Sequence, residues 1–293
     1  MMLKALPISL IMFAFGAPEL GLTAEPAQKE FRERDEFNQT YQLAPGTRVE
    51  VSSIRGGVEI ANADTATAEV QIIRTARTPA DLEHHKIEVK QTGDTLVIRG
   101  VQEPEQRGQN IQVNHYVVLK LPRRIDLSIN SISGPIRAGD IDGQARVNSI
   151  SGNATLGNVG GKLQVNSISG NLDAGNVGSE ARVNSISGSL RLGQVNGSLE
   201  ATSVSGNVNV TLVSLSPEGI QIRSVSGSVE IGFKAEVNAD FNADGVSGQV
   251  YLDLPNAIRD SEVKEPNVRA RIGAGGTPIM ISSVSGNIRV TRS

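Results

Sequence analysis

A four-residue motif, Ser-Ile-Ser-Gly or Ser-Val-Ser-Gly, recurs through the second half of this 293-residue chain. Five copies follow one another at a constant step of 18 residues, beginning at Ser131, Ser149, Ser167, Ser185 and Ser203. Three more begin at Ser224, Gly245 and Ser283, after steps of 21, 21 and 38 residues. A fixed period repeated in this way is the sequence signature of a solenoid, in which each unit stacks on the previous one.

Each 18-residue unit contains two similar halves. A weaker copy of the motif lies between the strong ones, at Asp140–Gly143, Asn158–Gly161, Asn176–Ser179 and Gln194–Gly197. Apolar residues within one unit follow steps of 4, 2 and 3 residues, as in Ile150, Ala154, Leu156, Val159, Leu163 and Val165. Period-2 alternation indicates a strand and the step of 3 indicates a corner. The pattern predicts an all-β fold, a parallel β-solenoid with about 18 residues per coil and coils stacked about 4.8 Å apart.

The composition favours a narrow interior for these coils. No aromatic residue lies between Tyr116 and Phe233, although the chain has three Tyr and six Phe in total. A ladder of Ile, Val, Leu and Ala leaves no room for rings, and we expect Ile150 and its equivalents to be part of that ladder. The chain has 31 Gly, and Gly at every ninth place is expected to adopt a positive φ or to allow a close backbone approach.

Polar residues between the apolar ones form columns along the predicted stack. Asparagines recur at Asn130, Asn148, Asn166 and Asn184, followed by Thr202, and are expected at a corner with amides hydrogen-bonded from coil to coil. Two outward columns are Arg137, Thr155, Asp173, Arg191, Asn209, Glu230 and Tyr251, and Arg146, Gln164, Arg182 and Glu200. They place Asp173 beside Arg191 and Arg182 beside Glu200, a ladder of charges that favours register. The alternative is a flat Ser and Asn surface that binds glycans or a partner.

The chain divides into four parts. Residues 1–24 are typical of a signal peptide, with Lys4 before a short apolar run, so we expect a periplasmic or secreted protein. Residues 25–39 are a charged linker, residues 40–130 an irregular start of the solenoid, and residues 131–293 its regular part with an insertion at 255–278. No other apolar run approaches the roughly 20 residues of a membrane-spanning helix, so no membrane span is expected.

The irregular part is expected to contain short strands and one helix. Thr78 and Pro79 predict a helix start, with Thr78 as the cap and the helix continuing to about Lys86. At the other end, the insertion could fold over the terminal coils. The chain stops just after Val290, within an arm, so we expect an open C-terminal edge that could mediate self-association.

The sequence shows no residues arranged for catalysis or cofactor binding. With 28 Lys and Arg against 31 Asp and Glu, it has no basic footprint for nucleic acid, and with no Cys it has no thiol site. His84 and His85 beside Asp81 and Glu83 are the one tight group of possible ligands, and adjacent His on a polar helix are usually solvated. Calcium-binding rolls need an Asp in every turn. We therefore expect no catalytic, cofactor-binding or metal residues, and no cofactor.

The run Pro45–Val51, the Ser-[Ile/Val]-Ser-Gly copies and the strand Val117–Leu121 resemble a bacterial family of putative adhesins. Its members carry a β-strand-repeat domain of unknown function, and the similarity covers roughly residues 40–293. The resemblance implies an exported or envelope-associated β-solenoid without catalytic residues. The leading hypothesis is a non-enzymatic, exported β-solenoid that acts through its surface as an adhesin-like or envelope-interaction protein, with envelope glycans or other surface proteins as partners. The alternatives are a scaffold that self-assembles through open coil edges and a carbohydrate-active β-helix enzyme.

Overall fold

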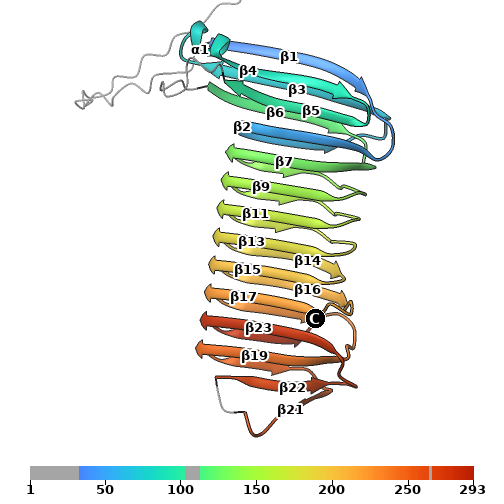
Figure 1. Cartoon of the computed structure of the whole chain (residues 1–293), viewed down its shortest axis with the longest axis vertical. Helices are drawn as coiled ribbons and strands as arrows, with labels where there is room; N and C mark the ends of the chain where they lie inside the picture. Colours follow the sequence, from blue (N-terminus) through green and yellow to red (C-terminus); the bar gives the residue numbers. More distant parts are fainter. Residues whose placement is uncertain (1–32, 103–112, 264–265) are drawn as a thin grey trace, which may run out of the picture. The chain divides into compact units, whose positions relative to one another are not determined.

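The structure, a computed structural model, describes residues 33–102, 113–263 and 266–293. Within them the chain is almost entirely β-strand, and the strands of successive repeats lie side by side as a stack (Figure 1). The expected all-β, mostly parallel solenoid is therefore confirmed. The predicted signal peptide and residues 25–32 of the predicted linker lie outside the described residues.

Two sheets form opposite walls of the stack, and each coil contributes one strand to each sheet. Sheet A contains, in spatial order, β1 (Glu33–Gln42), β3 (Thr67–Ala76), β6 (Val113–Leu121), β2 (Thr47–Asn62), β8 (Ile136–Ala138), β10 (Ala154–Leu156), β12 (Leu172–Ala174), β14 (Leu190–Asn196), β16 (Val208–Ser214), β18 (Val229–Phe233), β24 (Ile288–Arg292) and β20 (Val250–Asp253).

Sheet B has the same construction. It contains β4 (His85–Thr92), β5 (Thr95–Gln102), the first half of β2, β7 (Ile125–Ser133), β9 (Ala145–Ser151), β11 (Leu163–Ser169), β13 (Ala181–Ser187), β15 (Leu199–Ser205), β17 (Ile220–Ser226), β23 (Thr277–Ser285), β19 (Ala239–Ser247), β22 (Val268–Ile272) and β21 (Ala257–Arg259). The long strand β2 belongs to both sheets, since its first half pairs in sheet B and its second half in sheet A.

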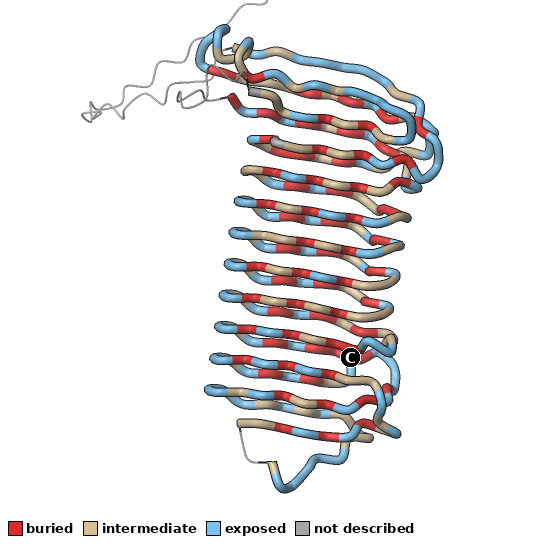
Figure 2. Tube along the Cα trace, in the orientation of Figure 1, coloured by how far each residue is buried: buried red, intermediate tan, exposed pale blue. Residues whose placement is uncertain are grey.

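The core lies between the two sheets. Strands of consecutive regular repeats pair in parallel with partners 18 residues apart, as Leu163 pairs with Ala181. Alternate residues point inward, so Ala145 and Val147 of β9 and Leu156 of β10 are buried (Figure 2). A third, short side is formed by single bridges between Ile141, Val159, Val177 and Val195. The interior of the regular coils is a column of small aliphatic side chains, as the missing aromatics predict.

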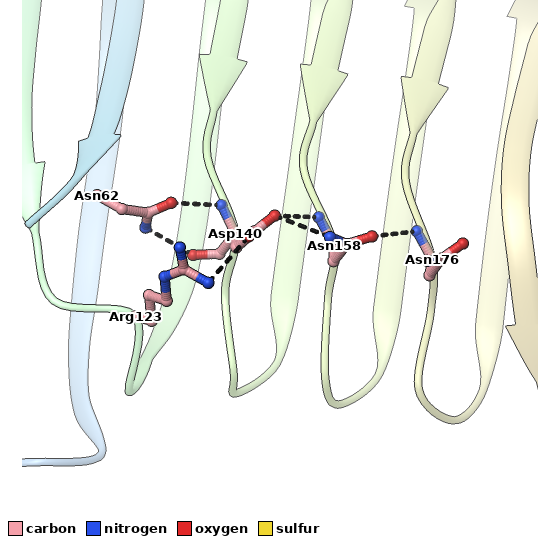
Figure 3. A network of polar contacts seen from close by, with 5 residues as sticks. All are labelled: Asn62, Arg123, Asp140, Asn158 and Asn176. Atoms are coloured by element: carbon pink, nitrogen blue, oxygen red, sulfur yellow. Dashed lines mark hydrogen bonds and ion pairs between the residues drawn. The ribbon is translucent and has the colours of Figure 1, made fainter.

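The corner that follows sheet A carries a ladder of polar side chains (Figure 3). The side-chain oxygen of Asn62 accepts a hydrogen bond from the backbone N–H of Asp140 at 2.7 Å, and the Asp140 carboxylate accepts one from the backbone N–H of Asn158 at 2.8 Å. The side-chain oxygen of Asn158 likewise accepts a hydrogen bond from the backbone N–H of Asn176 at 2.9 Å. Each coil thus satisfies a backbone donor of the next coil at a place where strand pairing stops. Arg123 also forms an ion pair with Asp140 at 3.1 Å.

The N-terminal part departs from the regular pattern. β1 pairs antiparallel with β3, and β4 pairs antiparallel with β5. The expectation of a linker is wrong for residues 33–39, because they belong to β1. The first four residues of this edge strand are all charged. The predicted helix is confirmed as α1 (Pro79–His84), where the Thr78 hydroxyl accepts a hydrogen bond from the Asp81 N–H at 3.2 Å. It ends two residues before the expected Lys86.

The C-terminal strands are not at the end of the stack. β24 lies between β18 and β20, and β23 lies between β17 and β19 (Figure 1). The expectation of an open C-terminal edge is therefore wrong, because both sides of the last arm are already paired. The insertion folds onto the last coil, where β22 pairs antiparallel with β19 and β21 with β22.

Among the described residues, no helix has the length and apolar character needed to span a membrane.

Candidate functional site

The Ile and Val residues of the repeat motif form an exposed row along the stack. We call this row the apolar stripe, and in spatial order it consists of Ile132, Ile150, Ile168, Ile186, Val204, Val225, Val284 and Val246. From Ile150 onward these side chains are between 44% and 75% exposed. The expectation that Ile150 and its equivalents lie in the interior ladder is therefore wrong.

Strand alternation explains why these side chains point outward. In β9 the inward positions are Ala145, Val147 and Ser149, so Ile150 falls on the opposite side. The buried position next to the corner is therefore taken by the first Ser of the motif, which is also buried at Ser185 and Ser203. The strand then ends at a glycine, which turns the chain into sheet A.

The glycines at this corner have both of the properties expected of them. Gly152 has a φ of 122° and Gly170 a φ of 126°, values that side chains rarely adopt. A Cβ atom on Gly170 would lie 2.2 Å from the carbonyl oxygen of Gly152 in the neighbouring coil. Only glycine allows the coils to approach this closely, so the corner holds the stripe residues in line.

A ladder of side-chain amides runs beside the apolar stripe. Nδ2 of Asn148 donates to Oδ1 of Asn130 at 2.7 Å, and the same bond recurs from Asn166 to Asn148 at 2.8 Å and from Asn184 to Asn166 at 3.0 Å. The predicted coil-to-coil hydrogen bonds are confirmed, but these residues lie within strands and not at a corner. Each inner amide of the ladder thus uses one of its two N–H donors and one lone pair of its oxygen on its neighbours.

A groove of about 560 Å³ separates the amide ladder from the apolar stripe over five coils. Its walls are the outward Asn and Ile columns and its floor is the inward Ser column, whose residues are Ser131, Ser149, Ser167 and Ser185. No Lys, Arg, Asp or Glu side chain lines it. The groove and the stripe together form an elongated, uncharged surface that consists of a groove and a ridge.

A second groove, of about 380 Å³, lies on the outer face of sheet B and is lined by charged residues. The predicted pair of Arg182 with Glu200 is present at 2.8 Å, and Lys162 pairs with Glu180 at 3.0 Å. On sheet A, Arg191 pairs with Asp173 at 3.4 Å, also as predicted. The expected order of that column is wrong at its end, since Arg289 lies between Glu230 and Tyr251. Charges of opposite sign are paired in both places, which suits stacking more than the binding of a charged ligand.

The histidines do not form the ligand group considered from the sequence. His85 begins β4 and is buried against His115 of β6, with ring centroids 5.6 Å apart. Burial and the nearby cations lower the pKa of His115 to about 4. Burial likewise lowers the pKa of His85, so the expectation of solvated histidines is wrong for this residue. Within residues 33–102, 113–263 and 266–293, no three His, Asp or Glu side chains are grouped to hold a metal ion.

Sequence reasoning missed the apolar stripe, although the signal was present. The two-residue alternation of the strand places Val147 and Ile150 on opposite sides, whereas the apolar spacing of 4, 2 and 3 residues does not distinguish the two sides. The sequence predicted no catalytic, cofactor-binding or metal residue. The absence of such residues stays a prediction.

Solved structures similar to this chain come from several bacteria. They include a "putative adhesin" from Bacteroides fragilis (12% identity, 88% of this chain and 97% of that chain covered, TM-score 0.47). A "putative cell adhesion protein" from Clostridium sporogenes (14% identity, 89% and 100% covered) has a TM-score of 0.29. A "putative lipid binding protein" from Parabacteroides distasonis (12% identity, 88% and 97% covered) has a TM-score of 0.26. These TM-scores are too low for the likeness to carry an argument.

No curated protein matches the chain. The model of one family, a domain of unknown function, matches residues 47–291, which include both sheets from β2 onward, the amide ladder and the apolar stripe. The chain therefore belongs to the Toastrack DUF4097 family.

Proposed function

We propose that this protein is a non-enzymatic, exported, adhesin-like protein that binds other proteins through the apolar stripe. The observation that carries the proposal is the concentration of exposed apolar side chains on one line. Of the twelve large apolar residues that are exposed in the described part of the chain, seven belong to the stripe. Isolated exposed apolar residues are ordinary, whereas a contiguous patch rimmed by polar residues is typical of a docking surface.

The chemistry of this surface favours a protein partner over a glycan. The amides of Asn148 and Asn166 each use one donor and one lone pair on their neighbours, so only half of their hydrogen-bonding capacity remains for sugar hydroxyls. The stripe consists only of Ile and Val and contains no aromatic ring. Apolar side chains in a long row are better matched by the apolar face of another protein.

The two alternatives have less support. The carboxylates in the charged groove are engaged, since Glu180 pairs with Lys162 and Asp126 accepts a hydrogen bond from the Gln144 N–H at 2.9 Å. A glycosidase would instead need two carboxylates converging on one bond. End-to-end stacking would use the outermost strands, which are β1 and β20 in sheet A and β4 and β21 in sheet B. In β1, residues Glu33–Glu36 are all charged. In β20, the Leu252 carbonyl already accepts a hydrogen bond from the Arg259 side chain at 3.3 Å. Charged side chains and occupied backbone groups at an edge discourage the addition of another strand.

The proposal is tested by co-sedimentation of the purified chain, diluted enough to be monomeric, with envelope fragments of bacteria that express it. The test variant carries Ile150→Thr, Ile168→Thr and Ile186→Thr, which keep the β-branch and remove apolar surface. The control carries Ile258→Thr and Met280→Thr, at exposed apolar residues outside the stripe. We expect the wild type and the control to bind, and the affinity of the triple variant to be lower by at least about 10-fold. Binding that survives protease digestion of the fragments, or equal binding by the triple variant, would contradict the proposal.

A further inference from the structure

We propose that the partner of the apolar stripe is the same surface of a second copy of this chain, which gives a two-fold homodimer. This inference rests on the proposed use of the stripe as a binding surface. It goes further because it names the partner and the symmetry of the contact. Three features of the surface support it: its shape, its spacing and its charge.

The surface is complementary to itself in shape. The ridge formed by Ile132, Ile150 and Ile168 runs directly beside the groove of about 560 Å³. A two-fold axis parallel to the stack, placed between ridge and groove, sets the ridge of each copy into the groove of the other. Closed homodimers use such isologous contacts, in which one patch meets itself. In this arrangement the two stacks run in the same direction along the axis, and the strands that face each other run in opposite directions.

The spacing of the stripe is matched by a second copy over its whole length. Adjacent strands in a sheet are about 4.8 Å apart, so eight coils carry a row of about 33 Å. A helix or an ordinary loop cannot present side chains at this spacing for that distance, whereas a second stack of coils does so at every level. Matched β-branched rows beside amide ladders form tightly interdigitated, dry contacts in stacked β-structures.

The charges bordering the surface are compatible with this contact. Arg223 and Asp244 continue the amide ladder beyond Thr202 and are exposed. With the axis parallel to the stack, each faces the outer Ser column of the other copy, at Ser226 and Ser247 respectively. No like charges oppose one another, and the groove itself is uncharged. Every surface brought together is thus apolar or neutral, apart from two charges that face hydroxyls.

The dimer is tested by sedimentation equilibrium of the purified full chain over a range of concentrations. We expect a reversible dimer for the wild type and for the control with Ile258→Thr and Met280→Thr. The triple variant Ile150→Thr, Ile168→Thr and Ile186→Thr is expected to dissociate at least 10-fold more readily, with an unchanged circular dichroism spectrum. A monomer at all concentrations, or a dimer that the triple variant leaves intact, overturns the inference. A monomeric wild type that still binds envelope fragments would refute the dimer and leave the proposed function standing.

The symmetry is tested separately by spin labels, because the chain contains no Cys and single-cysteine variants label at one place. Arg146→Cys and Gln221→Cys lie four coils apart in an outward column beyond the amide ladder, outside the proposed contact. An axis parallel to the stack predicts similar distances between the two labels of a dimer at both positions. A short distance at one position and a longer one at the other overturns this arrangement.

Discussion

At the scale of single residues, two kinds of position carry most of the constraint. The motif glycines allow coils to approach, since Gly170 combines a φ of 126° with a carbonyl oxygen 2.2 Å from where its Cβ would be. The buried histidines next to α1 place titratable groups in the interior, and the neighbouring strand β2 has Gly56 opposite His115. Each can be tested by one substitution.

The variant Gly170→Ala is expected to destabilise the protein by about 3 kcal/mol, since it combines a strained φ with a backbone clash. The matched control is Gly93→Ala, where φ is 55° and no atom lies within 4 Å of the added Cβ. The control should cost only about 1 kcal/mol, from φ alone. Urea unfolding followed by circular dichroism measures both. Equal losses would mean that the contact between coils does not matter.

The histidine pair predicts a pH dependence of stability. The folded protein keeps the pKa of His115 near 4, below its ordinary 6.5, because the imidazole is buried and faces His85, Arg74 and Arg55. The unfolded chain therefore binds the proton more readily. The stability from the neutral imidazole is complete above pH 6.5 and falls as the pH drops toward 4, by about 3 kcal/mol in all.

We expect His115→Phe and His115→Leu to flatten this decline, since neither side chain takes up a proton. Urea midpoints of the wild type and both variants at pH 4.5, 5.5 and 7.5 measure it. If both variants lose stability between pH 7.5 and 4.5 as steeply as the wild type, another group is responsible. Two variants of different size separate the effect of charge from that of packing.

At the scale of the elements, the sequence predicted the strands well and their facing less well. Apolar alternation in Ala145–Ser151 is enough to identify β9, and the constant step predicts its pairing with β11. The step of four from Ile150 to Ala154 spans a glycine corner, so the side that Ile150 faces follows from its step of three from the inward Val147 and not from its step to Ala154. A buried Ser149 hydroxyl is an unexpected neighbour of an aliphatic core, because hydroxyls are usually placed outside.

The pairing register predicts the effect of removing a coil. Deleting residues 163–180 joins Lys162 to Ala181, which is the residue that pairs with Leu163, so every strand keeps its sheet. We expect a folded, slightly less stable protein with the same circular dichroism spectrum. Deleting only residues 163–171 joins Lys162 to Leu172, which belongs to sheet A, and should give an unfolded or aggregated chain. Equal folding of both deletions would show that the coils have no fixed length.

At the scale of the whole stack, the order of the coils departs from the order of the sequence. Motif spacing predicts that the copy at Gly245 stacks on the copy at Ser224, but β23 lies between them. The motif copies are alike in sequence, so their spacing along the chain does not indicate which copies meet in the stack. β22 pairs with one side of β19, and β23, which follows β22 in the chain, lies on the other side of β19 and pairs with β17.

This order makes the last segment of the chain an internal part of the stack. Removing residues 277–293 deletes β23 and β24, which separate β17 and β18 from β19 and β20. We expect amide hydrogen exchange within residues 239–253 to become fast, since these strands lose their parallel partners, and exchange within residues 220–233 to rise because one side of that coil is exposed. Residues 145–187 lie several coils away and serve as the internal control, because each coil contacts only its neighbours. Continued protection of residues 239–253 would mean that β19 pairs directly with β17, as the motif spacing alone predicts, and that the C-terminal coil is an insertion without which the stack still closes.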